Sequence, residues 1–269
     1  MKNLQSKPNE VRVEKAIKFG KDIIREIGKS RELNLEELVV ASLFNSLLRR
    51  SKACLAINRE GLRDELYNML RVSLETYISL CYIIQKRKFI KDRATSYCVG
   101  YLKQQQTNIE TGENVANLQS SLNLIASKLE KEAYQRVINE WENARNKSEG
   151  KYTPKWYSLF NGPTSFAGEK GLIKKVLEET PAYKNQNKTA IFNTYKNLYG
   201  YFSQDAHGYN AIDNIILDQS TLQQPLGGED TDNALQLSVS FLVYSLKLIG
   251  ENVFPEYKKD IQFFIRSMY

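Results

Sequence analysis

The sequence contains a single histidine, His207, and is also poor in proline and glycine. One imidazole per chain excludes a zinc site built on several histidines within one subunit, and it excludes a catalytic pair of histidines. His207 is therefore either a packing residue or the one imidazole of a site that a second subunit could complete. Six prolines and 14 glycines are few for a β-rich protein with many turns, so the composition favours helices.

Cysteines are also scarce, and long apolar runs are missing. Cys54, Cys81 and Cys98 lack ligand-like spacing, so we expect free, buried thiols in a reducing compartment. The first 30 residues carry charges throughout, without the apolar stretch of a secretory signal. The stretch 69–84 contains charges, and 234–246 is shorter than the ~20 residues that cross a bilayer. We expect a cytoplasmic protein that does not span a membrane.

Helical periodicity runs along most of the chain, and no strand-like alternation is found. Asn34 and Glu37 have the spacing of a capping box, which predicts a helix start. A break at 58–61 predicts a long antiparallel αα-hairpin, whose second helix is apolar almost all round over 69–84 and should be the most buried. The predicted helices span 9–29, 35–57, 62–88, 93–110, 127–147, 169–179, 188–204, 231–249 and 255–267, with a loop at 219–232.

These elements predict one all-α domain over 1–269, without an internal repeat. The central region is polar and weakly patterned, so we interpret 105–150 as an exposed helical excursion. This excursion and the N-terminal helix at 1–30 are expected to be appended to a core formed by about 35–104 and 151–269. The acidic residues show no ligand-like clustering, so we expect no metal site and no cofactor.

The positive charge is concentrated in the first third of the chain. Residues 1–93 hold 20 Lys and Arg against 12 Asp and Glu, whereas the whole chain has a net charge of +7. Such asymmetry indicates either an anionic partner, such as RNA or a phosphate ligand, or solvated helix faces that happen to carry lysine. The candidate anion-binding residues are the cations of one short segment: Lys86, Arg87, Lys88, Lys91 and Arg93.

Two residue pairs four apart are candidates for a site. Arg71 and Glu75 share a face of the most apolar helix, where unpaired charges are costly. They form either a structural ion pair or a site, with Arg71 binding an anion and Glu75 orienting it. Ser203 and His207 share a face of a later helix, but they lack the nucleophile elbow of a hydrolase.

Together these motifs resemble a bacterial family, domain of unknown function 5677. The resemblance is carried by the pattern Arg71-x-x-x-Glu75, by Lys155-Trp156-Tyr157, and by a third pattern that runs from Tyr195 through Tyr199 and Ser203 to His207 and Gly208. It extends over roughly 38–250. More distantly, the chain is similar to the HEPN superfamily of helical bundles, many of which are metal-independent ribonucleases, toxins or antiphage effectors.

The resemblance implies a HEPN-like bundle that acts in phage defence or as a toxin. HEPN sites have four to six residues between an arginine and the histidine, but residues 200–202, which would hold that arginine, are Gly, Tyr and Phe here. Arg71 is therefore expected to supply the cation, Glu75 to orient it, Ser203 to hold His207 or a phosphate oxygen, and His207 to move the proton. The expected partners are RNA or another phosphate-containing ligand, a second copy of the chain, and a protein encoded nearby. The alternative is a non-enzymatic sensor or scaffold that binds a small anionic ligand or a protein.

Overall fold

The computed structural model describes residues 8–110, 127–147, 153–180, 187–206, 216–218, 221–223 and 231–268, together with residues 123, 125 and 149. Within these ranges the protein is all-α apart from one hairpin, as predicted. The α-helices are α1 (Pro8–Ser30), α2 (Leu35–Arg59), α3 (Arg63–Ile84), α4 (Ile90–Glu110), α6 (Lys131–Lys147), α7 (Leu172–Glu179), α8 (Lys188–Ala206), α9 (Thr231–Asn252) and α10 (Lys258–Ser267).

Three 3₁₀ turns and two short strands complete the described elements. The turns are η1 (Arg87–Phe89), η2 (Trp156–Ser158) and η5 (Pro255–Tyr257). Strand β1 (Ile216–Asp218) pairs antiparallel with β2 (Thr221–Gln223), and Leu217 lies opposite Leu222. The prediction of a loop throughout 219–232 is therefore wrong at β2, because three residues are too few to show a period-two pattern.

Helices α2 and α3 form the predicted antiparallel hairpin. The capping box at the start of α2 is present, since the Glu37 backbone N–H donates to Asn34 Oδ1 at 2.9 Å and the Asn34 N–H donates to Glu37 Oε2 at 3.1 Å. The hairpin turns at Gly61, whose φ of +74° lies in the left-handed region that glycine adopts without steric cost. The break predicted at 58–61 is confirmed.

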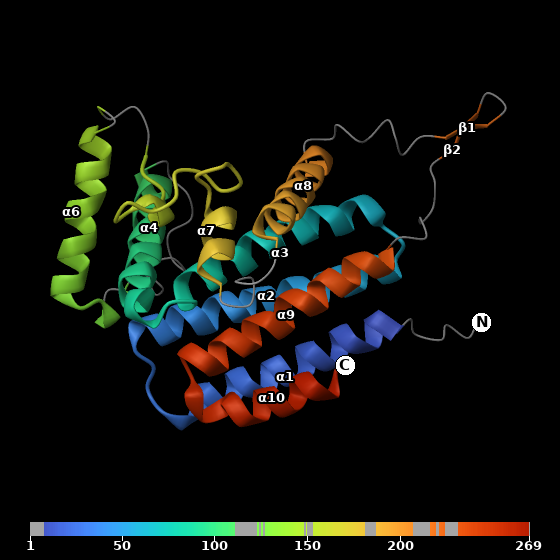
Figure 1. The fold of residues 1–269 in the computed structure, drawn as a ribbon, viewed down its shortest axis with the longest axis horizontal. Coiled ribbons are helices and arrows are strands. Elements are labelled where there is room, and N and C mark those ends of the chain that lie inside the picture. Colours follow the sequence, from blue (N-terminus) through green and yellow to red (C-terminus); the bar gives the residue numbers. More distant parts are fainter. Residues whose placement is uncertain are drawn as a thin grey trace.

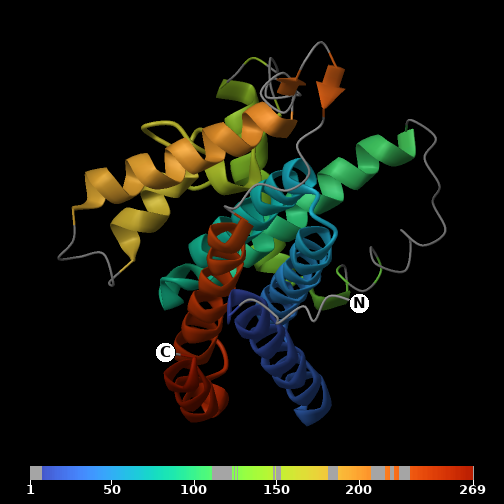
Figure 2. The same cartoon turned by 90° about the vertical axis from the view of Figure 1, so that its right-hand side faces the viewer.

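The core forms where α1, α2, α3 and α9 pack against one another (Figure 1). Helix α3 supplies a long series of residues that are at most 1% exposed: Leu66, Leu70, Leu74, Ile78, Leu80, Cys81, Ile83 and Ile84. Helix α10 packs on α9, while α7 and α8 cover the side of α3 that faces away from α1 (Figures 1 and 2). The expectation that α3 is the central helix is confirmed.

The described part of the predicted excursion is a second, smaller packing unit. Helix α6 lies beside α4 in Figure 1, and Val99, Val137, Trp141 and Leu159 form their own buried apolar cluster there. Cys54, Cys81 and Cys98 are free and buried, as predicted. Burial raises the pKa of Cys54 to about 11 and that of Cys98 to about 12, so these thiols stay protonated.

In the described residues no single helix is long and apolar enough to cross a membrane, although the bent pair Asn233–Asn252 and Pro255–Ser267 passes that test jointly.

Gly100 allows η2 to approach α4 closely. A methyl group at this position would lie 2.8 Å from Trp156 Cβ, whereas one at Gly28 would meet nothing within 4 Å. We therefore expect Gly28→Ala to stabilise the protein by up to about 1 kcal/mol through helix propensity. Gly100→Ala should instead destabilise it by about 1–3 kcal/mol, because the added methyl overpacks the contact.

Urea denaturation of the two variants and the wild type measures this difference. A Gly100→Ala protein as stable as Gly28→Ala would show that Trp156 does not pack tightly on α4.

Candidate functional site

Three motifs that are far apart in the sequence meet around Arg71. Its guanidinium carbon lies 5.5 Å from the centre of the Tyr199 ring on α8, and its Nε lies 3.4 Å from Glu75 Oε1. Burial raises the pKa of Tyr157 in η2, and electrostatic interactions with Tyr199 and Glu75 raise it further. Helix α3, turn η2 and helix α8 therefore each contribute to one cluster, which we call the Arg71 cluster: Arg71, Glu75, Tyr157 and Tyr199.

The Arg71 cluster is open to solvent. The side chains of Arg71 and Glu75 are 24% and 37% exposed, and Val72 between them is 38% exposed. The premise that both charges are buried in an all-round apolar helix is therefore wrong. Helices α2, α8 and α9 surround α3 but leave Arg71, Val72 and Glu75 partly uncovered. Three exposed residues do not interrupt the apolar pattern of the helix enough to be recognised from the sequence.

Arg71 keeps hydrogen-bonding capacity that the described residues do not use. Its Nε is buried and makes no hydrogen bond to them, because the contact with Glu75 has ion-pair distance but not hydrogen-bond geometry. The Tyr199 ring lies beside this guanidinium, and the Phe166 ring lies 5.0 Å from the Tyr199 ring. A cation flanked by half-buried rings suits a phosphate that carries a base.

The comparisons place these motifs in one family. Residues 37–222 match the model of a family of unknown function, DUF5677. The chain belongs to this family. No curated protein and no solved structure matches it. All four residues of the Arg71 cluster lie inside the DUF5677 match, whereas α1, α9 and α10 lie outside it.

The second half of the predicted site is only partly described. Within the DUF5677 match, Ser203 lies one turn after Tyr199 on α8 and is half-buried. His207 lies outside the described residues, so its distance from Arg71 stays a prediction. Contact between Arg71 and Tyr199 nevertheless shows that α3 and the helix leading to His207 are neighbours.

Arg50, which was not among the residues predicted from the sequence, lies beside the Arg71 cluster. Its Nη1 donates to the carbonyl of Val72 at 3.0 Å, and Glu75 interacts with it electrostatically. Burial lowers the pKa of Arg50, against the opposing effects of Tyr97 and Glu75. The signal was present, because residue 50 follows Leu43 and Leu47 at helical spacing on the inward face of α2.

The predicted anion-binding segment 86–93 does not join the Arg71 cluster. Gln85, the C-cap of α3, lies fourteen positions after Arg71, which corresponds to about 21 Å along the helix. Most of its cations already contact other groups: Lys91 pairs with Glu130 at 2.5 Å, Arg87 donates to the carbonyl of Glu251, and Lys88 lies 4.7 Å from the centre of the Phe89 ring. Binding of RNA by this segment stays a prediction.

Arg93 and Lys86 are held by Glu179 at the end of α7. Arg93 is buried, and its guanidinium carbon lies 3.8 Å from the centre of the Tyr82 ring. Its Nη2 donates to Glu179 Oε2 at 2.9 Å. Gln85 donates to the same oxygen at 2.8 Å, while Lys86 lies 3.1 Å from Oε1. This network joins α4 and α7 to the C-terminal end of α3.

No group of three or more His, Cys, Asp or Glu side chains among the described residues is arranged to hold a metal ion.

Glu179 makes the stability of the fold depend on pH. Burial alone would raise the pKa of its carboxyl, but attraction to Arg93 and hydrogen bonds from Arg93, Gln85 and Lys86 hold the pKa below its usual 4.5. A carboxylate with a lowered folded-state pKa stabilises the protein above its unfolded pKa and loses this contribution as the pH falls through the folded value. Stability should therefore decline below about pH 4.5.

Glu179→Gln should cost about 3–5 kcal/mol near pH 7, because it leaves Arg93 buried without a counter-charge. Its free energy of unfolding should also fall less steeply below pH 4.5. Urea denaturation between pH 3 and 7 tests both effects, with Glu178→Gln as the control, since Glu178 is the exposed neighbour. Equal stability of the two variants would contradict a structural role for the network.

Proposed function

We propose that this DUF5677 protein is a metal-independent endoribonuclease that binds single-stranded RNA at the Arg71 cluster. The observation that carries the proposal is the contact of Arg71 with Tyr199. It sets a partly exposed guanidinium beside the helix that leads to Ser203 and His207. A HEPN-like role in phage defence or as a toxin, in the cytoplasm of a bacterium, is the setting that the sequence resemblance suggests.

Arg71 suits the scissile phosphate because a guanidinium can present two parallel N–H donors to phosphate oxygens. Contact between Glu75 and Nε orients the group, and we assign its two terminal nitrogens to the phosphate. The charge that develops on the phosphate in the transition state would then face fixed donors. The rings of Tyr157, Phe166 and Tyr199 are half-buried and offer surfaces on which unstacked bases can lie.

The proposed reaction needs no oxidant, cofactor or metal. His207 accepts the proton of a ribose 2′-hydroxyl, and the 2′-oxygen then forms a bond to the neighbouring phosphorus. The bond from phosphorus to the 5′-oxygen breaks, which leaves a 2′,3′-cyclic phosphate and a 5′-hydroxyl. His207 of a second subunit donates the proton to the departing 5′-oxygen, so a homodimer supplies the second imidazole.

The first test is cleavage of a single-stranded RNA 30-mer in EDTA. We expect products with 2′,3′-cyclic phosphate ends, and no cleavage of the DNA of the same sequence, because it lacks the 2′-hydroxyl. His207→Ala should lower the rate about 10²–10⁴-fold. Arg71→Lys should lower it about 10²-fold or more although it keeps the charge, because it removes the paired donors.

Arg49→Ala is the control, since Arg49 is exposed on α2 and lies outside the cluster. Equal rates for wild type and His207→Ala would contradict the nuclease. Binding of the RNA to wild type without cleavage would favour the alternative, a non-enzymatic sensor or scaffold, provided that Arg71→Lys weakens the binding.

Tyr199 tests whether α8 positions Arg71. Tyr199→Phe keeps the ring and should retain activity, whereas Tyr199→Leu removes a cation–π contact of about 0.5–1 kcal/mol and should lower kcat/KM about two- to fivefold. Urea denaturation of both variants separates this effect from a loss of stability. If both variants lose activity equally, the ring face does not hold Arg71.

A further inference from the structure

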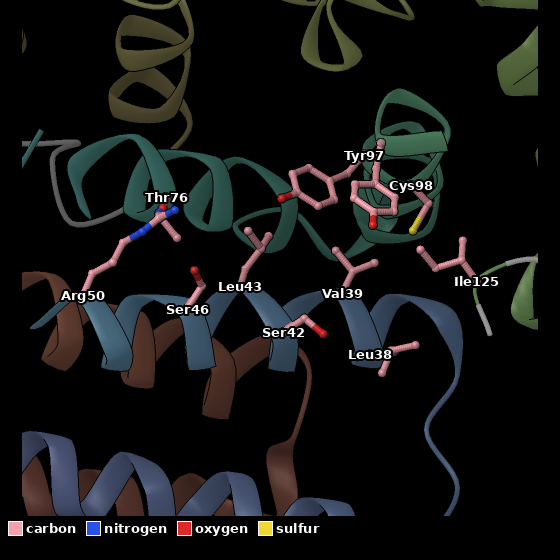
Figure 3. A pocket seen from close by; sticks show the side chains of 11 residues that line it. Leu38, Val39, Ser42, Leu43, Ser46, Arg50, Thr76, Tyr97, Cys98 and Ile125 are labelled. Carbon is pink, nitrogen blue, oxygen red and sulfur yellow. The ribbon is translucent and has the colours of Figure 1, made fainter. Parts of the chain in front are cut away.

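A cavity of about 340 Å³ lies between α2 and α4, with Thr76 of α3 at its inner side (Figure 3). This volume is at the lower end of small-molecule sites, which range from about 300 to 1,000 Å³. The cavity is separate from the Arg71 cluster, because none of the four cluster residues lines it. Its residues come mainly from α2 and α4, so the two helices form opposite walls.

One end of the cavity holds Arg50, a cation that forms no ion pair with the described residues. Arg50 is half-buried, and its Nη1 donates to the Val72 carbonyl. Glu75 attracts it only from beyond ion-pair distance. Tyr97, which lines the cavity from α4, interacts with Arg50 electrostatically. A partly desolvated guanidinium without a carboxylate at ion-pair distance is costly, so an anion would be favoured there.

The remainder of the cavity is mostly apolar. Leu38, Val39 and Leu43 project from α2, opposite Tyr97 and Cys98 of α4 (Figure 3). The Thr76 hydroxyl donates to the Val72 carbonyl at 2.9 Å, so it is already engaged. Such walls suit an aliphatic or aromatic group rather than the ribose and phosphates of an RNA strand.

We propose that this cavity binds a small amphipathic organic acid, whose acidic group pairs with Arg50 and whose apolar body lies between α2 and α4. The binding does not depend on RNA cleavage at the Arg71 cluster. The two sites are nevertheless neighbours, because Arg50 donates a hydrogen bond to the carbonyl of Val72, the residue that follows Arg71.

Two fluorescent probes with the same rings test the proposal. 1-Anilinonaphthalene-8-sulfonate carries an anion, and N-phenyl-1-naphthylamine lacks it. We expect wild type to bind one molecule of each, and Arg50→Gln to weaken the sulfonate at least tenfold while leaving the neutral probe within twofold. Arg49→Gln is the matched control, because it removes the adjacent, exposed arginine and should change neither affinity.

A second variant keeps Arg50 and tests whether the probes occupy the cavity between α2 and α4. Ser46 lines the cavity one turn before Arg50, so Ser46→Phe should fill it and weaken both probes at least tenfold. Thermal unfolding shows whether each variant is folded at the temperature of the titration. Equal affinity of wild type and Arg50→Gln for the sulfonate, or unchanged binding of both probes to Ser46→Phe, would overturn the proposal.

Competition distinguishes the class of acid. Decanoate, which has a carboxylate and an apolar chain, should displace the sulfonate probe from wild type, whereas adenosine monophosphate should not. Failure of decanoate to compete would contradict a ligand with an apolar body, whether or not the nucleotide displaces the probe. No RNA is present in these titrations, so a negative result here leaves the nuclease proposal unaffected, and the reverse also holds.

Discussion

Helix α3 packs against α2, α4, α7, α8 and α9, so its apolar side chains hold together segments from both halves of the chain. Each fully buried leucine or isoleucine in it contributes roughly 1.5–3 kcal/mol by leaving water. Because five helices pack on α3, its backbone is held firmly, and the few positions on it that no neighbour covers are held with it. Arg71 and Glu75 occupy that uncovered strip, which gives a polar cluster the rigid support that a binding site requires.

Three arginines show how differently the fold treats the same side chain. Arg93 is buried, stacked on Tyr82 and neutralised by Glu179, so its charge serves cohesion between α3, α4 and α7. Arg71 is partly exposed and forms an ion pair with Glu75. Arg50 is half-buried and bonded only to a carbonyl among the described residues, so it has the most to gain from an added anion. A count of positive charge along the sequence cannot separate these three cases.

Much of the helical fold could be predicted because helix ends and buried faces depend on residues that are close together in the sequence. The Asn34–Glu37 capping box and the left-handed Gly61 mark the ends of α2, and periodicity locates the core helices within a few residues. The site was harder, because exposure depends on which neighbour fails to cover a helix. Arg71 and Glu75 therefore looked buried from the sequence, and Arg50 was overlooked although it sits at an inward position. The pairing of Arg93 with Glu179 joins residues 86 positions apart, which periodicity does not report.

The position of α9 has a consequence for synthesis of the chain. Helices α1, α2 and α3 are complete at residue 84, yet α9, which packs against all three, ends at residue 252. At 5–20 residues per second, the ribosome takes on the order of ten to thirty seconds to make the difference. During that interval the apolar face that α9 later covers is exposed, which favours contact with other chains or with chaperones until α9 has emerged.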